Sequence, residues 1–124
     1  MFHPRTTKTV LVGEDDTAIG EFLVAIFKTE TSYQALLATD GFQALEMVKN
    51  LVPDLFILDY RLPSMNGLEL YDHFQMTEEL KAIPALLLSA HAPLREMKKR
   101  NISFVKKPFE LEELLETIEK LLAE

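Results

Sequence analysis

The chain has 124 residues, 48% of them hydrophobic and 27% charged, with a formal net charge of −7 at pH 7. Its length fits one domain, and its apolar content is sufficient for a folded core rather than a disordered segment. The acidic balance argues against direct binding of nucleic acid, which requires a basic face. The sequence contains no cysteine, which excludes a disulfide framework and a thiolate metal site and is compatible with the cytoplasm.

No apolar run approaches the length of a membrane span, and residues 1–5 lack the apolar core of a signal peptide. No repeat, low-complexity tract or linker divides the chain. We therefore expect a cytoplasmic protein with no membrane partner. We also expect a single domain over residues 1–124, with its core at about residues 8–123.

Short apolar runs alternate with amphipathic stretches along the chain. Runs typical of strands lie at residues 9–12, 33–38, 55–58, 84–89 and 102–105. Stretches with apolar residues at helical spacing follow them at residues 18–27, 42–48, 68–74, 93–100 and 111–122. Asp16 or Thr17 would cap the first helix, and the fourth helix is short at best.

Five alternating strand–helix units predict an α/β protein with a parallel sheet covered by helices on both faces. Periodicity does not determine the order of the strands. The common arrangement for five such units is the flavodoxin-like, doubly wound sheet with strand order 2-1-3-4-5. That order would place the first and third strands side by side, with their carboxyl ends at one edge.

The third predicted strand ends in a carboxylate. Four consecutive apolar residues, 55–58, indicate a strand buried on both faces, and Asp59 follows directly. An ionised carboxylate is costly to bury unless it is paired or hydrogen-bonded. Ligands bind at the carboxyl ends of the strands in such sheets, so Asp59 is the candidate centre of a site. The alternative is that Asp59 only begins a turn through Leu62 and Pro63.

Reactive side chains also follow three other predicted strands: Glu14 and Asp15 after the first, Ser89 after the fourth and Lys107 after the fifth. Two carboxylates about 4 Å apart repel by roughly 4 kcal/mol at an effective dielectric constant of about 20, so a cation must offset them. An oxygen-rich set suits Mg²⁺, with Mn²⁺ as an alternative ion. Carboxylate, metal ion, lysine and hydroxyl together favour phosphoryl transfer to Asp59. The ordinary alternatives are acidic residues at a helix N-terminus, a capping serine and a surface lysine.

Four segments together resemble the receiver domain of two-component response regulators. They are Val-Leu-Val-Gly-Glu-Asp-Asp at residues 10–16, Pro-Asp-Leu-Phe-Ile-Leu-Asp-Tyr-Arg-Leu-Pro-Ser-Met-Asn-Gly at 53–67, Leu-Leu-Ser-Ala at 87–90 and Phe-Val-Lys-Lys-Pro-Phe at 104–109. The resemblance begins at about residue 8, covers nearly the whole chain and implies the flavodoxin-like fold. It also implies that a sensor histidine kinase or a histidine phosphotransfer protein donates a phosphoryl group to Asp59.

The resemblance assigns metal-binding roles as well. Asp15 and the backbone carbonyl of Arg61 would bind Mg²⁺ together with Asp59, and Glu14 would act through a water molecule. The chain would then be a phosphoacceptor signalling domain rather than an enzyme, although it would carry out its own Mg²⁺-dependent autophosphorylation and autodephosphorylation.

In the switching mechanism that the resemblance implies, Ser89 and Lys107 bind the phosphoryl oxygens, and phosphorylation draws Ser89 toward the phosphoryl group. Phe104 then rotates into the vacated space and changes the surface of the fourth helix, fifth strand and fifth helix for a downstream protein or output domain. Because Phe104 lacks a tyrosine hydroxyl, we expect its ring to stay mostly inward. Arg61 and His91 flank the site at positions that influence the lifetime of the acyl phosphate.

The chain departs from the family between Ser89 and Lys107, an interval that is shorter than usual by roughly one helical turn. Residues 100–103, Arg-Asn-Ile-Ser, replace the usual Gly-Ala turn. We interpret residues 98–100 as a solvated helix C-terminus that suits the helix dipole. Packing roles are the simplest interpretation of four methionines, Met47, Met65, Met76 and Met97.

Two other functions compete with the receiver. A phosphatase of the haloacid-dehalogenase type also forms an aspartyl phosphate, but it requires a second acid two residues after the nucleophile, where this chain has Arg61. A degenerate receiver would act only as a binding module, yet all five key positions of this chain carry chemically competent side chains.

Overall fold

The protein is described by a computed structural model that covers residues 7–91 and 93–123, so the N-terminal segment 1–5 lies outside the described residues. Five parallel strands form a sheet in the order β2-β1-β3-β4-β5. This confirms the predicted flavodoxin-like, doubly wound α/β fold. The strands are β1 (Thr9–Gly13), β2 (Gln34–Ala38), β3 (Leu55–Asp59), β4 (Ala85–Ser89) and β5 (Ser103–Lys106).

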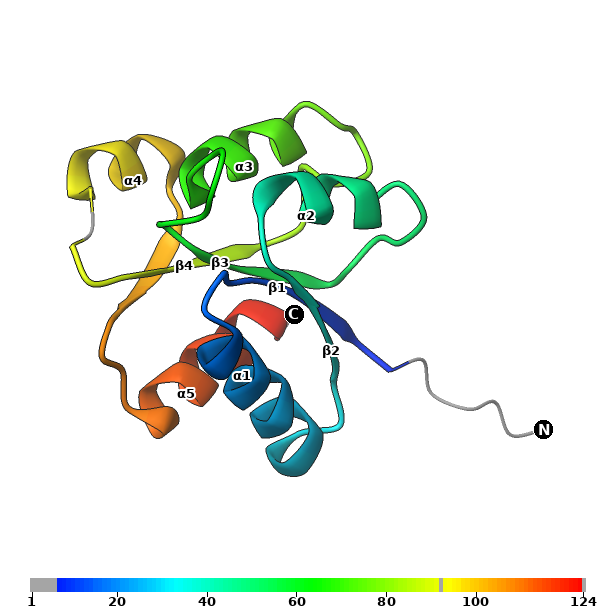
Figure 1. The fold of residues 1–124 in the computed structure, drawn as a ribbon, viewed down its shortest axis with the longest axis vertical. Coiled ribbons are helices and arrows are strands. Elements are labelled where there is room, and N and C mark those ends of the chain that lie inside the picture. Colours follow the sequence, from blue (N-terminus) through cyan, green and yellow to red (C-terminus); the bar gives the residue numbers. More distant parts are fainter. Residues whose placement is uncertain (1–6, 92, 124) are drawn as a thin grey trace.

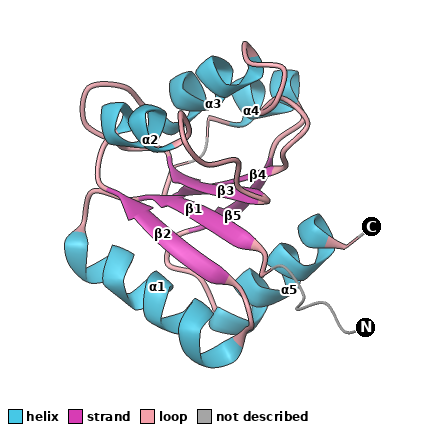
Figure 2. Cartoon of the chain, turned by 90° about the vertical axis from the view of Figure 1, so that its right-hand side faces the viewer, coloured by secondary structure: helices cyan, strands magenta, loops and turns pink. Residues whose placement is uncertain are grey.

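Helices cover both faces of the sheet, as Figures 1 and 2 show. They are α1 (Thr17–Glu30), α2 (Gly41–Met47), α3 (Gly67–Gln75), α4 (Leu94–Arg100) and α5 (Leu111–Leu122). Helices α1 and α5 lie on one face, and α2, α3 and α4 lie on the other. Within the described ranges, none of these helices has the length and apolar character that a bilayer crossing requires.

Capping side chains determine where the first two helices begin. Asp16 accepts a hydrogen bond from the backbone N–H of Ile19 at 3.1 Å, which makes it the N-cap of α1. It is one of the two residues predicted for this role. Asp40 does the same for α2 by accepting from the N–H of Gln43 at 2.7 Å. Helix α2 therefore begins at Gly41, one residue earlier than its apolar spacing predicts.

The core divides into two hydrophobic clusters, one on each face of the sheet. Successive side chains of a strand point to opposite faces, so Phe56 and Leu58 join one cluster while Leu55 and Ile57 join the other. Every residue of β3 and β4 is buried, which explains their continuous apolar runs. On the α3 side, the ring of Phe56 stacks on that of Phe74 with centroids 4.0 Å apart. Strand β3 is thereby fixed at the centre of the molecule.

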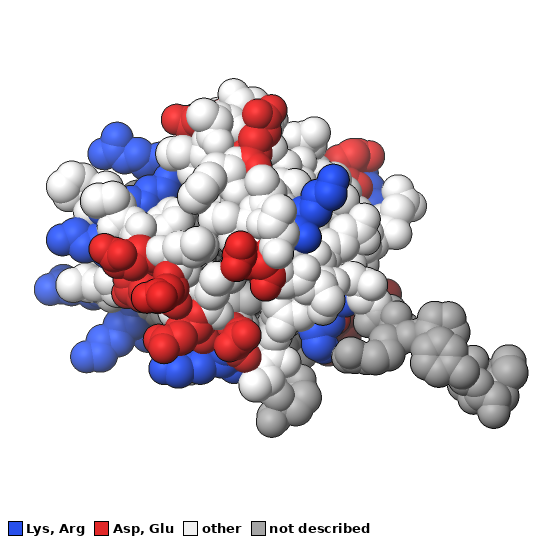
Figure 3. Space-filling view, turned by 90° about the horizontal axis from the view of Figure 1, so that it is seen from below, with Lys and Arg blue, Asp and Glu red and all other residues white. Residues whose placement is uncertain are grey.

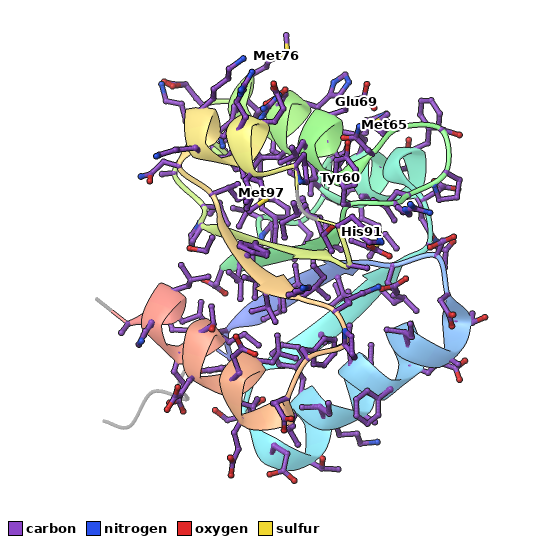
Figure 4. All side chains as sticks on the ribbon, turned by 90° about the vertical axis from the view of Figure 1, so that its left-hand side faces the viewer. Tyr60, Met65, Glu69, Met76, His91 and Met97 are labelled. Carbon is purple, nitrogen blue, oxygen red and sulfur yellow. The ribbon has the colours of Figure 1, made fainter. Side chains whose placement is uncertain are left out.

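The four methionines differ in their surroundings. Met97 is 4% exposed and lies on the inner side of α4 (Figure 4), while Met47 and Met65 are partly buried against the same cluster. These three have the predicted packing role. Met76 is 82% exposed and projects away from the protein (Figure 4), so the packing interpretation is wrong for this residue. It lies at the end of α3, where the chain leaves the core.

Helix α4 is short, as predicted, and Asn101 ends it in a left-handed conformation with φ 54° and ψ 42°. The backbone N–H of Asn101 donates to the carbonyl of Lys98 at 3.2 Å, which closes the last turn. Glycine is the usual residue in this conformation, and asparagine is among the few alternatives. Asn101 thus supplies the left-handed residue that ends α4 in this chain.

This geometry predicts opposite outcomes for two substitutions at Asn101. Asn101→Gly keeps the left-handed turn and should leave the free energy of unfolding nearly unchanged, whereas Asn101→Ala should lower it by about 1 kcal/mol. Urea denaturation measures both values. Asn50→Ala is the matched control, because Asn50 is an exposed asparagine whose φ is not positive. Equal stability of the alanine and glycine variants would contradict the prediction.

Candidate functional site

The backbone at the carboxyl edge of the sheet is held by the last hydrogen bonds of the strand ladder. The N–H of Glu14 donates to the carbonyl of Ala38 at 2.9 Å, which ties the end of β1 to β2. The N–H of Lys107 donates to the carbonyl of Ser89 at 2.9 Å, which ties the end of β5 to β4. Because the sheet fixes the backbone on this edge, side chains from distant parts of the sequence converge there with little freedom.

The Lys107 side chain lies between two carboxylates, those of Glu14 and Asp59. Its Nζ donates to Oε1 of Glu14 at 2.9 Å and to Oδ2 of Asp59 at 3.1 Å. Only 19% of the Lys107 side chain is exposed, so both ion pairs are shielded from solvent. The peptide bond between Lys107 and Pro108 is cis. The structure thus joins the ends of β1, β3 and β5 through one ammonium group.

Three carboxylates form a cluster on this edge. Glu14, Asp15 and Asp59 each offer one oxygen, and these oxygens lie within 4.8 Å of one another. Glu14 and Asp59 are 1% and 6% exposed, whereas Asp15 is open to solvent. Hard oxygen ligands of this kind fit Mg²⁺ or Mn²⁺, because these ions prefer carboxylates and water to nitrogen or sulfur.

Burial has a strong effect on the Glu14 carboxyl group. Desolvation raises its pKa from 4.5 to about 7, and the neighbouring Asp59 carboxylate adds to the shift, while the hydrogen bond from Lys107 opposes it. For Lys107, burial acts in the opposite direction, but the bonds to Glu14 and Asp59 outweigh it and raise the pKa of the ammonium group. One positive charge therefore only partly offsets the crowded carboxylates, and further positive charge would be favourable here.

The loop between β3 and α3 packs tightly against Asp59. The N–H of Arg61 donates to Oδ1 of Asp59 at 3.2 Å, and the N–H of Gly67 donates to the carbonyl of Tyr60 at 2.9 Å. A Cβ atom on Gly67 would lie 2.5 Å from the carbonyl oxygen of Asp59, so only glycine fits. No role of its own was predicted for Gly67, although the Asn-Gly pair at residues 66–67 is a signal that could have indicated this close approach.

Asn66 begins α3 with a reciprocal pair of hydrogen bonds. Its side chain accepts from the N–H of Glu69 at 2.8 Å, and the Glu69 side chain accepts from the N–H of Asn66 at 2.8 Å. Ser64, two residues before Asn66, has a φ of 75°, a conformation that normally favours glycine. The loop that follows Asp59 is thus rigidly closed at its helix end and strained at its tip.

A cavity of about 310 Å³ opens beside Asp59. Its lining consists of Asp59, Arg61, Ser89, Ala90, His91 and Lys107. The lining therefore includes all the non-acidic residues that were predicted for the site, with the exception of Phe104. Ser89 is 3% exposed, while Arg61 and His91 are exposed and lie at the rim. The structure therefore brings the two predicted rim residues next to the central aspartate.

Phe104 lies outside this cavity lining. It belongs to β5, where its backbone pairs with Leu87 of β4, and 36% of the residue is exposed. The core therefore does not enclose this residue, and the inward position of its ring stays a prediction. Among the described residues, the site that was inferred from strand ends thus consists of two buried carboxylates and one exposed carboxylate, a bridging lysine and a serine-lined cavity.

The fold and this edge define the class: a flavodoxin-like α/β protein with an acidic site at the carboxyl ends of β1 and β3. The sequence pattern of the family described as "Response regulator receiver domain" matches residues 10–119. The chain belongs to this family. It is accordingly a signalling domain of two-component systems rather than a conventional enzyme.

Two curated relatives and one solved structure illustrate the similarity. Sporulation initiation phosphotransferase F of Bacillus subtilis is 30% identical over 117 residues, which cover 91% of this chain and 92% of that protein. Response regulator MprA of Mycobacterium leprae is 35% identical over 91% of this chain, but this match covers only 50% of the relative. The structure of response regulator TrrA of Thermotoga maritima in complex with Mg²⁺ and BeF has a TM-score of 0.82 at 30% identity, covering 94% of this chain and 100% of that chain.

The raised pKa of Glu14 predicts how stability depends on pH without metal. The folded protein binds this proton more tightly than the unfolded chain, so stability is lost as pH rises from about 4.5 to about 7. From about pH 5 to about pH 8, the unfolding free energy of the wild type should fall by roughly 2 to 3 kcal/mol relative to Glu14→Gln. Urea denaturation in excess chelator measures both. Parallel pH profiles of the two proteins would contradict the prediction.

Proposed function

We propose that this chain is the phosphoacceptor of a two-component phosphorelay and receives its phosphoryl group on Asp59. A sensor histidine kinase or a histidine phosphotransfer protein is the donor. A carboxylate oxygen of Asp59 attacks phosphorus, the new P–O bond forms as the P–N bond breaks, and the donor imidazole leaves with the electron pair. The observation that carries this proposal is the buried Asp59 carboxylate, in contact with Lys107 at 3.1 Å and beside Glu14 and Asp15.

The residues around Asp59 have different roles in binding the phosphoryl group. Lys107 neutralises negative charge on the transferred oxygens, and Ser89 donates a hydrogen bond to one of them. Asp15, Asp59 and the backbone carbonyl of Arg61 would bind Mg²⁺, with Glu14 acting through water. When bound, Mg²⁺ supplies charge neutralisation and orients the phosphoryl group for in-line transfer. The relative from Thermotoga maritima was solved in complex with Mg²⁺ and BeF, which supports Mg²⁺ as the ion in this proposal.

The signal then passes to a surface formed by α4, β5 and α5. In this proposal Ser89 moves toward the phosphoryl group, and Phe104 follows it inward. Phe104 is partly exposed already, so a change in its position alters the outer surface directly. A downstream protein or an output domain then recognises this surface.

The charge distribution supports a protein partner rather than a nucleic acid. Figure 3 shows the face covered by α1 and α5, where acidic side chains gather toward α5. The first turn of α5 alone carries Glu112 and Glu113. Basic side chains border this acidic group in Figure 3, so a polyanion would be repelled at α5 itself, where a basic segment of a partner would be attracted.

Treatment with Mg²⁺ and a small phosphodonor tests the proposal against its alternatives. With phosphoramidate or acetyl phosphate, the wild type should gain one acid-stable, base-labile phosphoryl group by mass spectrometry, and Asp59→Asn should gain none. Asp54→Asn is the matched control, because Asp54 lies at the opposite end of β3 and accepts from the N–H of Thr9. Sustained turnover of the donor would favour the hydrolase, and no phosphorylation would favour the binding module.

The rim residues Arg61 and His91 should affect the lifetime of the phosphoryl group. Both are exposed at the mouth of the cavity, so replacing both with alanine opens a path for water to the acyl phosphate. We expect severalfold faster dephosphorylation, followed as loss of phosphoprotein after the donor is removed. Arg95→Ala removes an exposed arginine away from the cavity and should leave the rate unchanged. An unchanged rate in the double variant would reject this role.

A further inference from the structure

Helix α4 is attached to the rest of the protein unevenly. Its N-terminal end has no side-chain cap at Pro93, and Leu94 is 63% exposed. Met97 is the buried residue of α4, and it faces the sheet (Figure 4). Among the described residues, the first buried side chain of α4 is therefore Met97, and its first turn is exposed or uncapped.

The C-terminal end of α4 is held differently. Arg100 donates to both oxygens of Asp72 on α3, from Nε to Oδ1 at 2.8 Å and from Nη2 to Oδ2 at 2.7 Å. Its third nitrogen, Nη1, donates to the Glu96 carbonyl at 2.8 Å and to Glu96 Oε1 at 3.2 Å. Only 22% of the Arg100 side chain is exposed. The predicted solvated C-terminus is correct for Lys98 and Lys99 but wrong for Arg100.

Most surface ion pairs contribute little to stability, but the Arg100–Asp72 pair has the geometry of the few that contribute more. Two parallel hydrogen bonds from a planar guanidinium to one carboxylate fix orientation as well as distance. Arg100 is further restrained by its own helix through Glu96, so it loses less freedom when it pairs with Asp72. By contrast, the neighbouring Lys99 makes a single contact of 3.4 Å to Glu96 and is well exposed.

We propose that the Arg100–Asp72 ion pair is a latch that fixes the C-terminal end of α4 to α3 and makes α4 pivot about that end. The latch itself is a property of the free protein, whereas its use in signalling rests on the proposed function. The chain runs from Ser89 in the site directly to the N-terminal end of α4, which is the unlatched end. A shift of Ser89 would then displace Leu94 and Arg95 most and leave Lys98 and Lys99 nearly in place.

The pivot also defines which part of the outer surface carries the signal. Leu94 is an exposed apolar side chain at the moving end, and Arg95 beside it is exposed as well. A protein that distinguishes the two states would need an apolar contact for Leu94. A partner that contacted only Lys98 and Lys99 would bind both states equally, because differential binding requires a difference in structure.

Native-state hydrogen exchange of the unphosphorylated protein tests the latch. The amides of Met97 and Ile102 report on α4, because they donate to the carbonyls of Pro93 and Met97. In Arg100→Lys and Asp72→Asn, both amides should exchange about fivefold faster relative to the amides of β3. The control Lys99→Gln removes a neighbouring charge and should leave the ratio unchanged. Equal exchange ratios in all four proteins would overturn the latch.

A second measurement tests the pivot. With Mg²⁺ and beryllofluoride bound to the wild type, exchange should change at Met97 and remain constant at Ile102. In Asp72→Asn the change should extend to Ile102. A uniform change along α4 in the wild type would overturn the pivot. Failure of beryllofluoride to bind would contradict the proposed function, and the latch would still be judged by the first measurement, which requires no phosphorylation.

Discussion

The contact of one ammonium group with two buried carboxylates determines how this molecule is organised. Glu14 and Asp59 are almost inaccessible to water, and burial of an ionised carboxylate is costly unless a partner offsets it. Lys107 reaches both, at 2.9 and 3.1 Å, from the position that directly follows β5, a strand at the edge of the sheet. The pairing depends on the register of the parallel strands, because a slip of one residue would turn each side chain to the other face. The register of the parallel strands thus places Lys107 within reach of both carboxylates.

The packing on the two faces of the sheet holds the elements of the site in different ways. On the side of α1 and α5, a closed apolar cluster supports β1 and β3 from below. On the other side, the chain after Asp59 closes tightly through Gly67 into α3, and the stacked rings of Phe56 and Phe74 hold that helix against β3. Helix α4 is the exception, since its main polar attachment is Arg100. Helix α4, with an uncapped and exposed first turn, is thus the next element after Ser89 of the site.

Much of this architecture could be predicted from the sequence, because buried parallel strands leave continuous apolar runs that end at one edge. Spacing could not show which carboxylate is buried. Glu14 and Asp15 are adjacent, yet only the first is enclosed and meets a lysine 93 residues later. The same limit explains the error at Arg100, whose partner Asp72 lies 28 residues earlier on another helix. Periodicity assigns a side chain to a face, whereas long charged side chains find partners through three-dimensional proximity.

The closed turn before α3 also bears on the chemical durability of the protein. An asparagine followed by glycine is the dipeptide most prone to spontaneous deamidation, because the glycine nitrogen attacks the asparagine side chain to form a cyclic imide. Here the N–H of Gly67 is donated to the carbonyl of Tyr60, and the Asn66 side chain is occupied by the N–H of Glu69. Both reacting groups are therefore restrained away from cyclisation. The loop beside Asp59 should consequently age more slowly than its sequence suggests.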